Sequence, residues 1–116
     1  MSSKLTLRQQ QSLFVEMVAK LIQFAIENGY ELTFGDAYRD PRVFGGFGER
    51  RGYGAANSFH KRRLAVDFNL FKDGRWLNKT EDHKLLGEYW ESIGGSWGGR
   101  FRSPDGNHYS LGESRK

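Results

Sequence analysis

Apolar residues recur at three- and four-residue spacing early in the chain, which is the pattern of an amphipathic helix. The positions of this stripe are Leu13, Phe14, Met17, Val18, Leu21, Phe24 and Ala25. Thr6 and Gln9 fit a capping box at the start of the helix, and Asn28-Gly29 is a typical helix end. We expect the apolar stripe to form part of the core, without a functional role.

Strand patterns follow in two places. Between Tyr30 and Phe34, apolar and polar residues alternate, which predicts a strand. The nearly continuous apolar run Leu64–Phe71 predicts a central strand. Lys72–Arg75 is a typical turn, and Trp76-Leu77 starts the return strand, so the sequence predicts a hairpin here.

A second helix is predicted after this hairpin, with Thr80 as its N-cap. Its apolar side consists of Leu85, Leu86, Tyr89, Trp90 and Ile93. Gly94-Gly95 ends it, and a Pro-Asp-Gly turn leads to a last strand at Asn107–Leu111. This order predicts one α+β domain over residues 1–116, with a small antiparallel sheet packed against two main helices.

The segment between the first two strands has no helix or strand pattern. Its centre, Val43–Gly54, is rich in glycine, arginine and aromatic residues. A loop of this length in a compact domain is usually functional or disordered. Either a flap near a functional site or a simple surface cover fits the Gly45–Gly54 part of this loop.

Composition limits the chemistry that is available. The chain has no cysteine, which excludes disulfides and thiolate zinc sites, so a metal would need histidine and carboxylate ligands. The net charge of +4 favours an anionic partner such as nucleic acid, a phospholipid surface or a bacterial cell wall. No signal peptide and no membrane span are recognisable, so we expect no stable membrane association.

Asp67 is the most unusual residue in this pattern, because a carboxylate within an apolar strand is costly to bury without a partner. His60 lies seven residues before it, and His108 lies far downstream. Imidazole and carboxylate ligands together suit Zn²⁺, and three protein ligands leave an open position for catalysis. On one unbroken strand His60 and Asp67 would face opposite sides, so the chain must bend at Lys61–Arg63.

Asp105 precedes His108 by three residues and could lie beside such a metal without binding it. A carboxylate there could act as general base toward water and as general acid toward a leaving amine. A simpler interpretation also holds: three histidines and many acidic residues produce some His/Asp pair by chance, and Asp105 suits a turn. His83 is expected to be an ordinary residue of the second helix.

Several short motifs resemble the family of zinc D-Ala-D-Ala carboxypeptidases and L-alanyl-D-glutamate peptidases, which includes many bacteriophage endolysins and shares its fold with the hedgehog signalling domain. They are Ala37-Tyr38-Arg39, Ser58-x-His60-x(4)-Ala65-x-Asp67, Trp97-Gly98-Gly99 and Asp105-x-x-His108-Tyr109. The resemblance extends roughly from Tyr30 to Leu111. It implies zinc bound by His60, Asp67 and His108, and Asp105 as the catalytic carboxylate.

The same resemblance implies that Arg39 holds a carboxylate or carbonyl of the substrate and that Ser58 is a secondary substrate contact. Three positions depart from the family pattern. Many relatives have glycine at Arg63 and an acidic residue at Ser110, and some have glutamate at Asp105. Aspartate at that last position is typical of the phage endopeptidase branch.

The resemblance therefore implies a zinc metallopeptidase that cleaves the peptidoglycan stem peptide, as a monomeric phage endolysin acting in host lysis. We expect it in the host cytoplasm, reaching the periplasmic wall once a separate protein permeabilises the membrane. One alternative is a D-Ala-D-Ala carboxypeptidase. Another is a non-catalytic module that binds nucleic acid through the basic, aromatic stretch Phe44–Tyr53. A third is a protein with the family fold that has lost catalysis and only binds the cell wall or a partner. The sequence fixes neither the cleaved bond nor the host.

Overall fold

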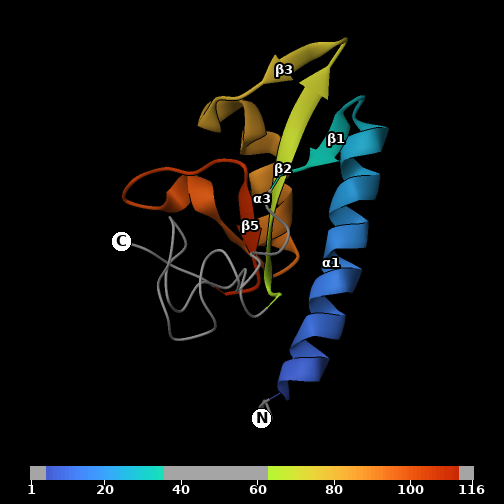
Figure 1. The fold of residues 1–116 in the computed structure, drawn as a ribbon, viewed down its shortest axis with the longest axis vertical. Helices are drawn as coiled ribbons and strands as arrows, with labels where there is room; N and C mark the ends of the chain where they lie inside the picture. Colours follow the sequence, from blue (N-terminus) through green and yellow to red (C-terminus); the bar gives the residue numbers. More distant parts are fainter. Residues whose placement is uncertain (1–4, 36–62, 113–116) are drawn as a thin grey trace, which may run out of the picture.

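The computed structural model describes residues 5–35 and 63–112. A long helix, α1 (Leu7–Glu27), lies along one side of the molecule (Figure 1). Its predicted capping box is present, because Thr6 Oγ1 accepts from the Gln9 N–H at 3.1 Å while Gln9 Oε1 accepts from the Thr6 N–H at 2.8 Å. Asn28 caps the other end, and Gly29 follows in the left-handed region with a φ of 84°.

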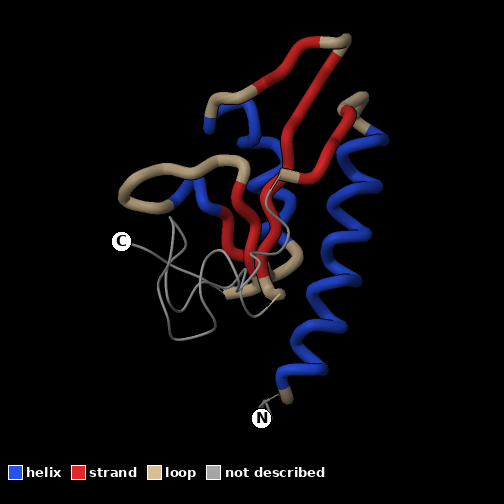
Figure 2. The backbone as a smooth tube through the Cα atoms, in the orientation of Figure 1, coloured by secondary structure: helices blue, strands red, loops and turns tan. Residues whose placement is uncertain are grey.

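The sheet is antiparallel and is built around one long strand, β2 (Ala65–Lys72). Strand β1 (Glu31–Phe34) pairs with one edge of β2. The other edge is shared by β3 (Arg75–Leu77) and β5 (His108–Ser110), and β5 pairs further with β4 (Ser96–Trp97). Figure 2 shows the strands in red, with β3 and β5 on the same side of β2.

The predicted hairpin between β2 and β3 is confirmed. Asp73 and Gly74 have φ values of 53° and 76°, so both central turn residues are in the left-handed region. Two such residues form the tight turn that joins antiparallel strands with their natural twist, and Asp-Gly is a preferred pair for it.

The second helix starts differently from the prediction, which placed Thr80 at its N-cap. A 3₁₀ helix, η1 (Thr80–His83), precedes the α-helix α3 (Lys84–Ser92). The predicted N-cap is wrong because the Thr80 hydroxyl accepts from the Gly106 N–H at 3.2 Å. The Asp82 carboxylate accepts from the Lys79 N–H at 3.1 Å instead. Thr80 therefore fixes a distant turn and does not cap the helix.

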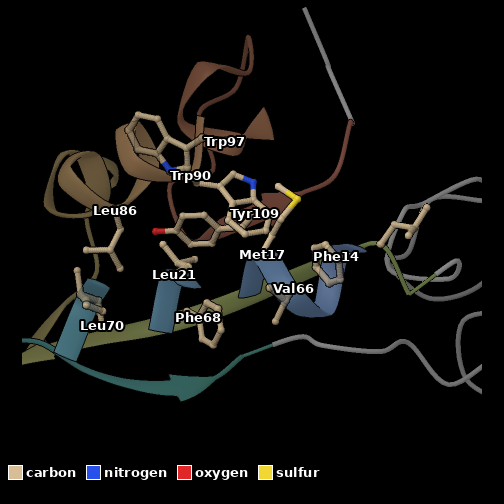
Figure 3. Close-up of a cluster of buried hydrophobic side chains, with 12 residues drawn as sticks. Phe14, Met17, Leu21, Val66, Phe68, Leu70, Leu86, Trp90, Trp97 and Tyr109 are labelled. Carbon is tan, nitrogen blue, oxygen red and sulfur yellow. The ribbon is translucent and has the colours of Figure 1, made fainter. Parts of the chain in front are cut away.

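The core lies between the two helices and one face of the sheet (Figure 3). The stripe of α1 supplies Phe14, Met17, Leu21 and Ala25 to it, as the periodicity predicted. Alternate residues of β2, including Phe68, face these side chains, and Tyr109 joins them from β5. A domain of two helices and a small antiparallel sheet is thus α+β, which confirms the expected class.

Within the two described ranges, no helix combines the length and the apolar character needed to cross a membrane.

A further 3₁₀ helix, η2 (Gly98–Arg100), leaves β4 and starts the loop that returns to β5. This loop contains Asp105, so its anchoring positions the functional site.

Candidate metal and catalytic site

Asp67 lies in the middle of β2, on the face opposite to the core. Its neighbours Val66 and Phe68 are buried in the core, and alternation along the strand turns Asp67 to the other side. Two backbone hydrogen bonds hold this part of the strand. Gly35 N–H donates to the Asp67 carbonyl at 2.7 Å, and Phe68 N–H donates to the Asn107 carbonyl at 2.9 Å.

His108 is the direct cross-strand partner of Asp67 in the register of β2 and β5. Because Asp67 directs its backbone carbonyl toward β1, the two residues form a non-hydrogen-bonded pair, in which side chains approach most closely. His108 Nδ1 lies 3.0 Å from Asp67 Oδ1. The imidazole is buried against the ring of Phe101, with 5.5 Å between centroids, while Asp67 keeps 13% of its side chain exposed.

This pair fits two ligands of one zinc ion. In a tetrahedral site with bonds of about 2.0–2.2 Å, two ligand atoms are separated by about 3.3 Å. The observed separation of 3.0 Å is close to that value, and the atoms are an imidazole nitrogen and a carboxylate oxygen. Within residues 5–35 and 63–112, however, no third histidine, aspartate or glutamate completes a cluster that could hold a metal.

Three predicted site residues, Arg39, Ser58 and His60, lie outside the described residues, as does the Gly45–Gly54 loop. The structure therefore brings together Asp67 and His108 of the predicted ligand set. Of the predicted bend at Lys61–Arg63, the structure describes Arg63. Its φ of 62° lies in the left-handed region. That conformation favours glycine, which accounts for the glycine that many relatives have there.

Asp105 lies in the turn before β5, and this turn is held by its neighbours on several sides. Asp105 N–H donates to the Gly98 carbonyl at 2.8 Å, and the Asp105 carbonyl accepts from the His108 N–H at 3.1 Å. Trp97 Nε1–H donates to the Gly106 carbonyl at 2.7 Å. With Thr80 bonded to Gly106 N–H, the turn is fixed to β4 and to η1 together.

Gly98 permits this arrangement. A Cβ at this position would lie 2.2 Å from the Asp105 carbonyl oxygen and 2.8 Å from His108 Cβ. Any side chain would therefore push the strand and the turn apart. The sequence did not indicate that Thr80 contributes to the site. The Trp97-Gly98-Gly99 motif was visible in the sequence, but its role in holding the Asp105 turn was not.

Asp105 is half-buried and lines a pocket of about 300 Å³. Ser110, where relatives often have an acidic residue, is fully buried two residues beyond His108 on the same strand. Its carbonyl accepts from Trp90 Nε1–H at 2.8 Å, which ties β5 to α3.

His83 is not the ordinary helix residue that the sequence indicated. It ends the 3₁₀ helix η1, is 2% exposed, and has Nδ1 2.8 Å from the Tyr109 hydroxyl. Burial lowers the pKa of His83 to about 4, and the nearby Asp82 carboxylate opposes this shift only partly. Burial also raises the pKa of Tyr109. His83 is therefore a neutral residue paired with the core tyrosine.

Comparison with known proteins places these features in a family. The family model described as D-alanyl-D-alanine carboxypeptidase matches residues 51–111, which include Asp67, Asp105 and His108. No curated protein matches the sequence significantly. The crystal structure of Serratia marcescens L-Ala D-Glu endopeptidase ChiX is similar with a TM-score of 0.64 and 15% sequence identity, covering 91% of this chain and 83% of that chain.

The structural likeness confirms the α+β fold of this chain. The family match covers more than half of the chain and spans both strands that bring Asp67 and His108 together. This chain belongs to the D-alanyl-D-alanine carboxypeptidase family of peptidases.

Proposed function

We propose that the protein is a zinc-dependent peptidase that hydrolyses the L-alanyl-D-glutamate amide bond of the peptidoglycan stem peptide. One observation carries the proposal: Asp67 and His108 lie 3.0 Å apart, ligand atom to ligand atom, on paired strands inside the region that the family model matches. A buried histidine and a carboxylate at this separation suit a borderline metal such as Zn²⁺. Members of this family are generally zinc-dependent.

In this mechanism Asp67, His108 and His60 would hold the ion. Zinc, when bound, supplies Lewis acidity that polarises the scissile carbonyl and activates water at neutral pH. Asp105 takes the proton of the attacking water and then donates it to the leaving amine nitrogen. Arg39 orients a substrate carboxylate or carbonyl, and Ser58 makes a secondary substrate contact.

Replacement of the proposed general base tests this assignment. The Asp105→Ala variant should lose peptidoglycan hydrolysis by at least about a hundredfold, the usual contribution of a positioned acid–base group. Zinc content, measured by mass spectrometry of protein purified without added metal, should stay near one per chain. The control is Asp73→Asn, which removes one charge from an exposed hairpin residue and should hydrolyse like the parent. Undiminished hydrolysis by Asp105→Ala would refute the role of this carboxylate.

A D-Ala-D-Ala carboxypeptidase is the second candidate, because the matching family model carries that description. The two activities give different products from the same muropeptides. Loss of one alanine in mass spectra of a digest indicates trimming, whereas release of stem peptides that begin at D-glutamate indicates the endopeptidase.

Host lysis by a bacteriophage is the biological setting that we propose for this activity. The net charge of +4 suits an anionic cell wall. Expressed in the cytoplasm together with a membrane-permeabilising protein, the parent chain should lyse Gram-negative cells, and Asp105→Ala should not. Equal lysis by both variants, or none by either, would contradict this setting.

A further inference from the structure

The pocket beside Asp105 arises from the way in which two strands share one edge of β2. Strand β5 pairs with Ala65–Asp67, and β3 pairs with Leu70–Lys72 of the same strand. Phe68 and Asn69 lie between these two pairings, where β3 has ended and β5 has not begun (Figures 1 and 2). The pocket of about 300 Å³ opens at this gap.

The lining of this pocket is polar and aromatic. It includes Asn69, Asn78, Asn107, Thr80 and Trp76. The Asn69 amide donates to Thr33 Oγ1 at 3.2 Å and the Thr80 hydroxyl accepts from Gly106 N–H, so Asn78 and Asn107 are the asparagines that the subsite uses. Among the described lining residues, Asp105 is the one with a carboxylate, and none is lysine or arginine. Side-chain amides both donate and accept hydrogen bonds, so these walls suit the peptide groups of an extended chain more than a free carboxylate.

Trp76 has the largest apolar side chain in the lining, beside Phe68, Leu77 and Pro104, and 61% of its surface is accessible. It pairs with Phe71 in the register of the hairpin, so it stands on the same face of the sheet as Asp67 and Asn69. Exposed tryptophans beside polar pockets are typical of binding sites, because they supply a large contact area at low entropic cost.

The position of Asp105 in the wall decides which half of a substrate the pocket can take. The proposed proton donor must lie next to the leaving amine nitrogen. Trp76 and Asn78 line the same pocket as Asp105, so a chain attached to that nitrogen has room to extend along them. A pocket of this volume corresponds to a drug-sized ligand and is much larger than a single alanine needs.

We propose that this pocket is a leaving-group subsite that binds two or more residues of the stem peptide on the amine side of the cleaved bond. The inference rests on the proposed endopeptidase function and adds to it a requirement for substrate length. Trp76 packs against the bound chain, and the amides of Asn78 and Asn107 hydrogen-bond its peptide groups.

Two substrates with the same acyl half test the subsite. One ends at the D-glutamate that follows the cleaved bond, and the other continues through the diamino acid and D-alanine. For the parent protein, kcat/KM should be about tenfold or more higher for the long substrate, and Trp76→Ala should lower this long-to-short ratio about tenfold. Trp76→Phe should recover part of the ratio, and Asn78→Ala should lower it by a smaller factor.

The matched control is Arg75→Ala, which alters the residue before Trp76 on the same strand and does not line the pocket. Its long-to-short ratio should equal that of the parent. Equal kcat/KM for both substrates in the parent, or an unchanged ratio in a folded Trp76→Ala variant, overturns the subsite while the proposed function stands. Cleavage of neither substrate by the parent overturns the proposed function and the subsite together.

Discussion

Two histidine–oxygen pairs lie on opposite faces of the same small sheet. His83 Nδ1 is 2.8 Å from the Tyr109 hydroxyl on the core side, and His108 Nδ1 is 3.0 Å from Asp67 Oδ1 on the other side. Both imidazoles are at most 2% exposed. His108 and Tyr109 are consecutive residues of β5, so one strand serves both pairs.

The partner of each histidine makes the difference. A phenol hydroxyl satisfies a buried neutral imidazole and completes its environment. The Asp67 carboxylate is partly exposed and places a negative charge and further lone pairs beside His108. A cation can bind to these lone pairs. Burial and hydrogen bonding alone therefore do not distinguish the two histidines, whereas the charge of the partner and the face of the sheet do, and these two features favour His108 as the proposed ligand.

Replacing each of the two histidines by glutamine, one at a time, should give the largest difference between their roles. His108→Gln should lower peptidoglycan hydrolysis at least about a thousandfold, because the ion and the catalysis that depends on it are lost together. Zinc content should fall in parallel. His83→Gln should keep zinc near one per chain, and loss of zinc in this variant would end the distinction between the pairs.

The pH dependence of stability is the next largest expected effect. His83 has a pKa of about 4 in the folded protein against 6.5 when exposed, so below pH 6.5 the unfolded chain binds more protons. Stability is then complete above about pH 6.5 and is lost progressively as the pH falls to about 4, by about 3 kcal/mol in total. Chemical denaturation at several pH values measures this loss, and His83→Gln should flatten the curve in that window.

Filling the space at Gly98 should damage the Asp67–His108 side selectively. Gly98→Ala forces its Cβ against the Asp105 carbonyl and His108, which should cost about 2 kcal/mol of stability. Hydrolysis should fall further than stability explains, since the turn that carries Asp105 moves. Ser103→Ala, an exposed change in the same loop, is the control and should match the parent in both measurements.

The smallest expected effect is a gain. Arg63 occupies the left-handed region immediately before β2, where a side chain costs energy that glycine avoids. Glycine relieves this strain but also makes the unfolded chain more flexible, which favours unfolding. The net effect of Arg63→Gly should be a rise of about 0.5–1 kcal/mol in the free energy of unfolding. A decrease in that free energy would mean that contacts of the Arg63 side chain outweigh the backbone strain.

Periodicity and turn chemistry were sufficient to predict most of the fold. Three elements have a clear local sequence pattern, and the same pattern determines where each one packs. They are the apolar stripe of α1, the Asp73-Gly74 hairpin and the apolar run of β2. The start of α3 was missed because Asp82 and Thr80 could both serve local caps, and only the distant Gly106 decides between them. Short β4 has no alternation to read, since two residues cannot show a period.

The site was predictable to a different degree. An aspartate in an apolar strand and a distant histidine could be recognised as candidates, and the structure brings their side chains to 3.0 Å, while metal binding by Asp67 and His108 stays a prediction. His60, Arg39, Ser58 and the role of Asp105 stay predictions. The pocket at Asn69 and Trp76 could not be foreseen, because it depends on where two strands end along a third.

The shared edge of β2 has an evolutionary consequence. His108, one of the proposed ligands, belongs to one pairing partner of this strand, and Trp76 in the pocket wall belongs to the other. Changes in length or sequence of the β2–β3 hairpin can then alter which peptides are accepted without disturbing the ligands. Under the proposed function, selection for other substrates can vary this hairpin separately from the proposed metal ligands.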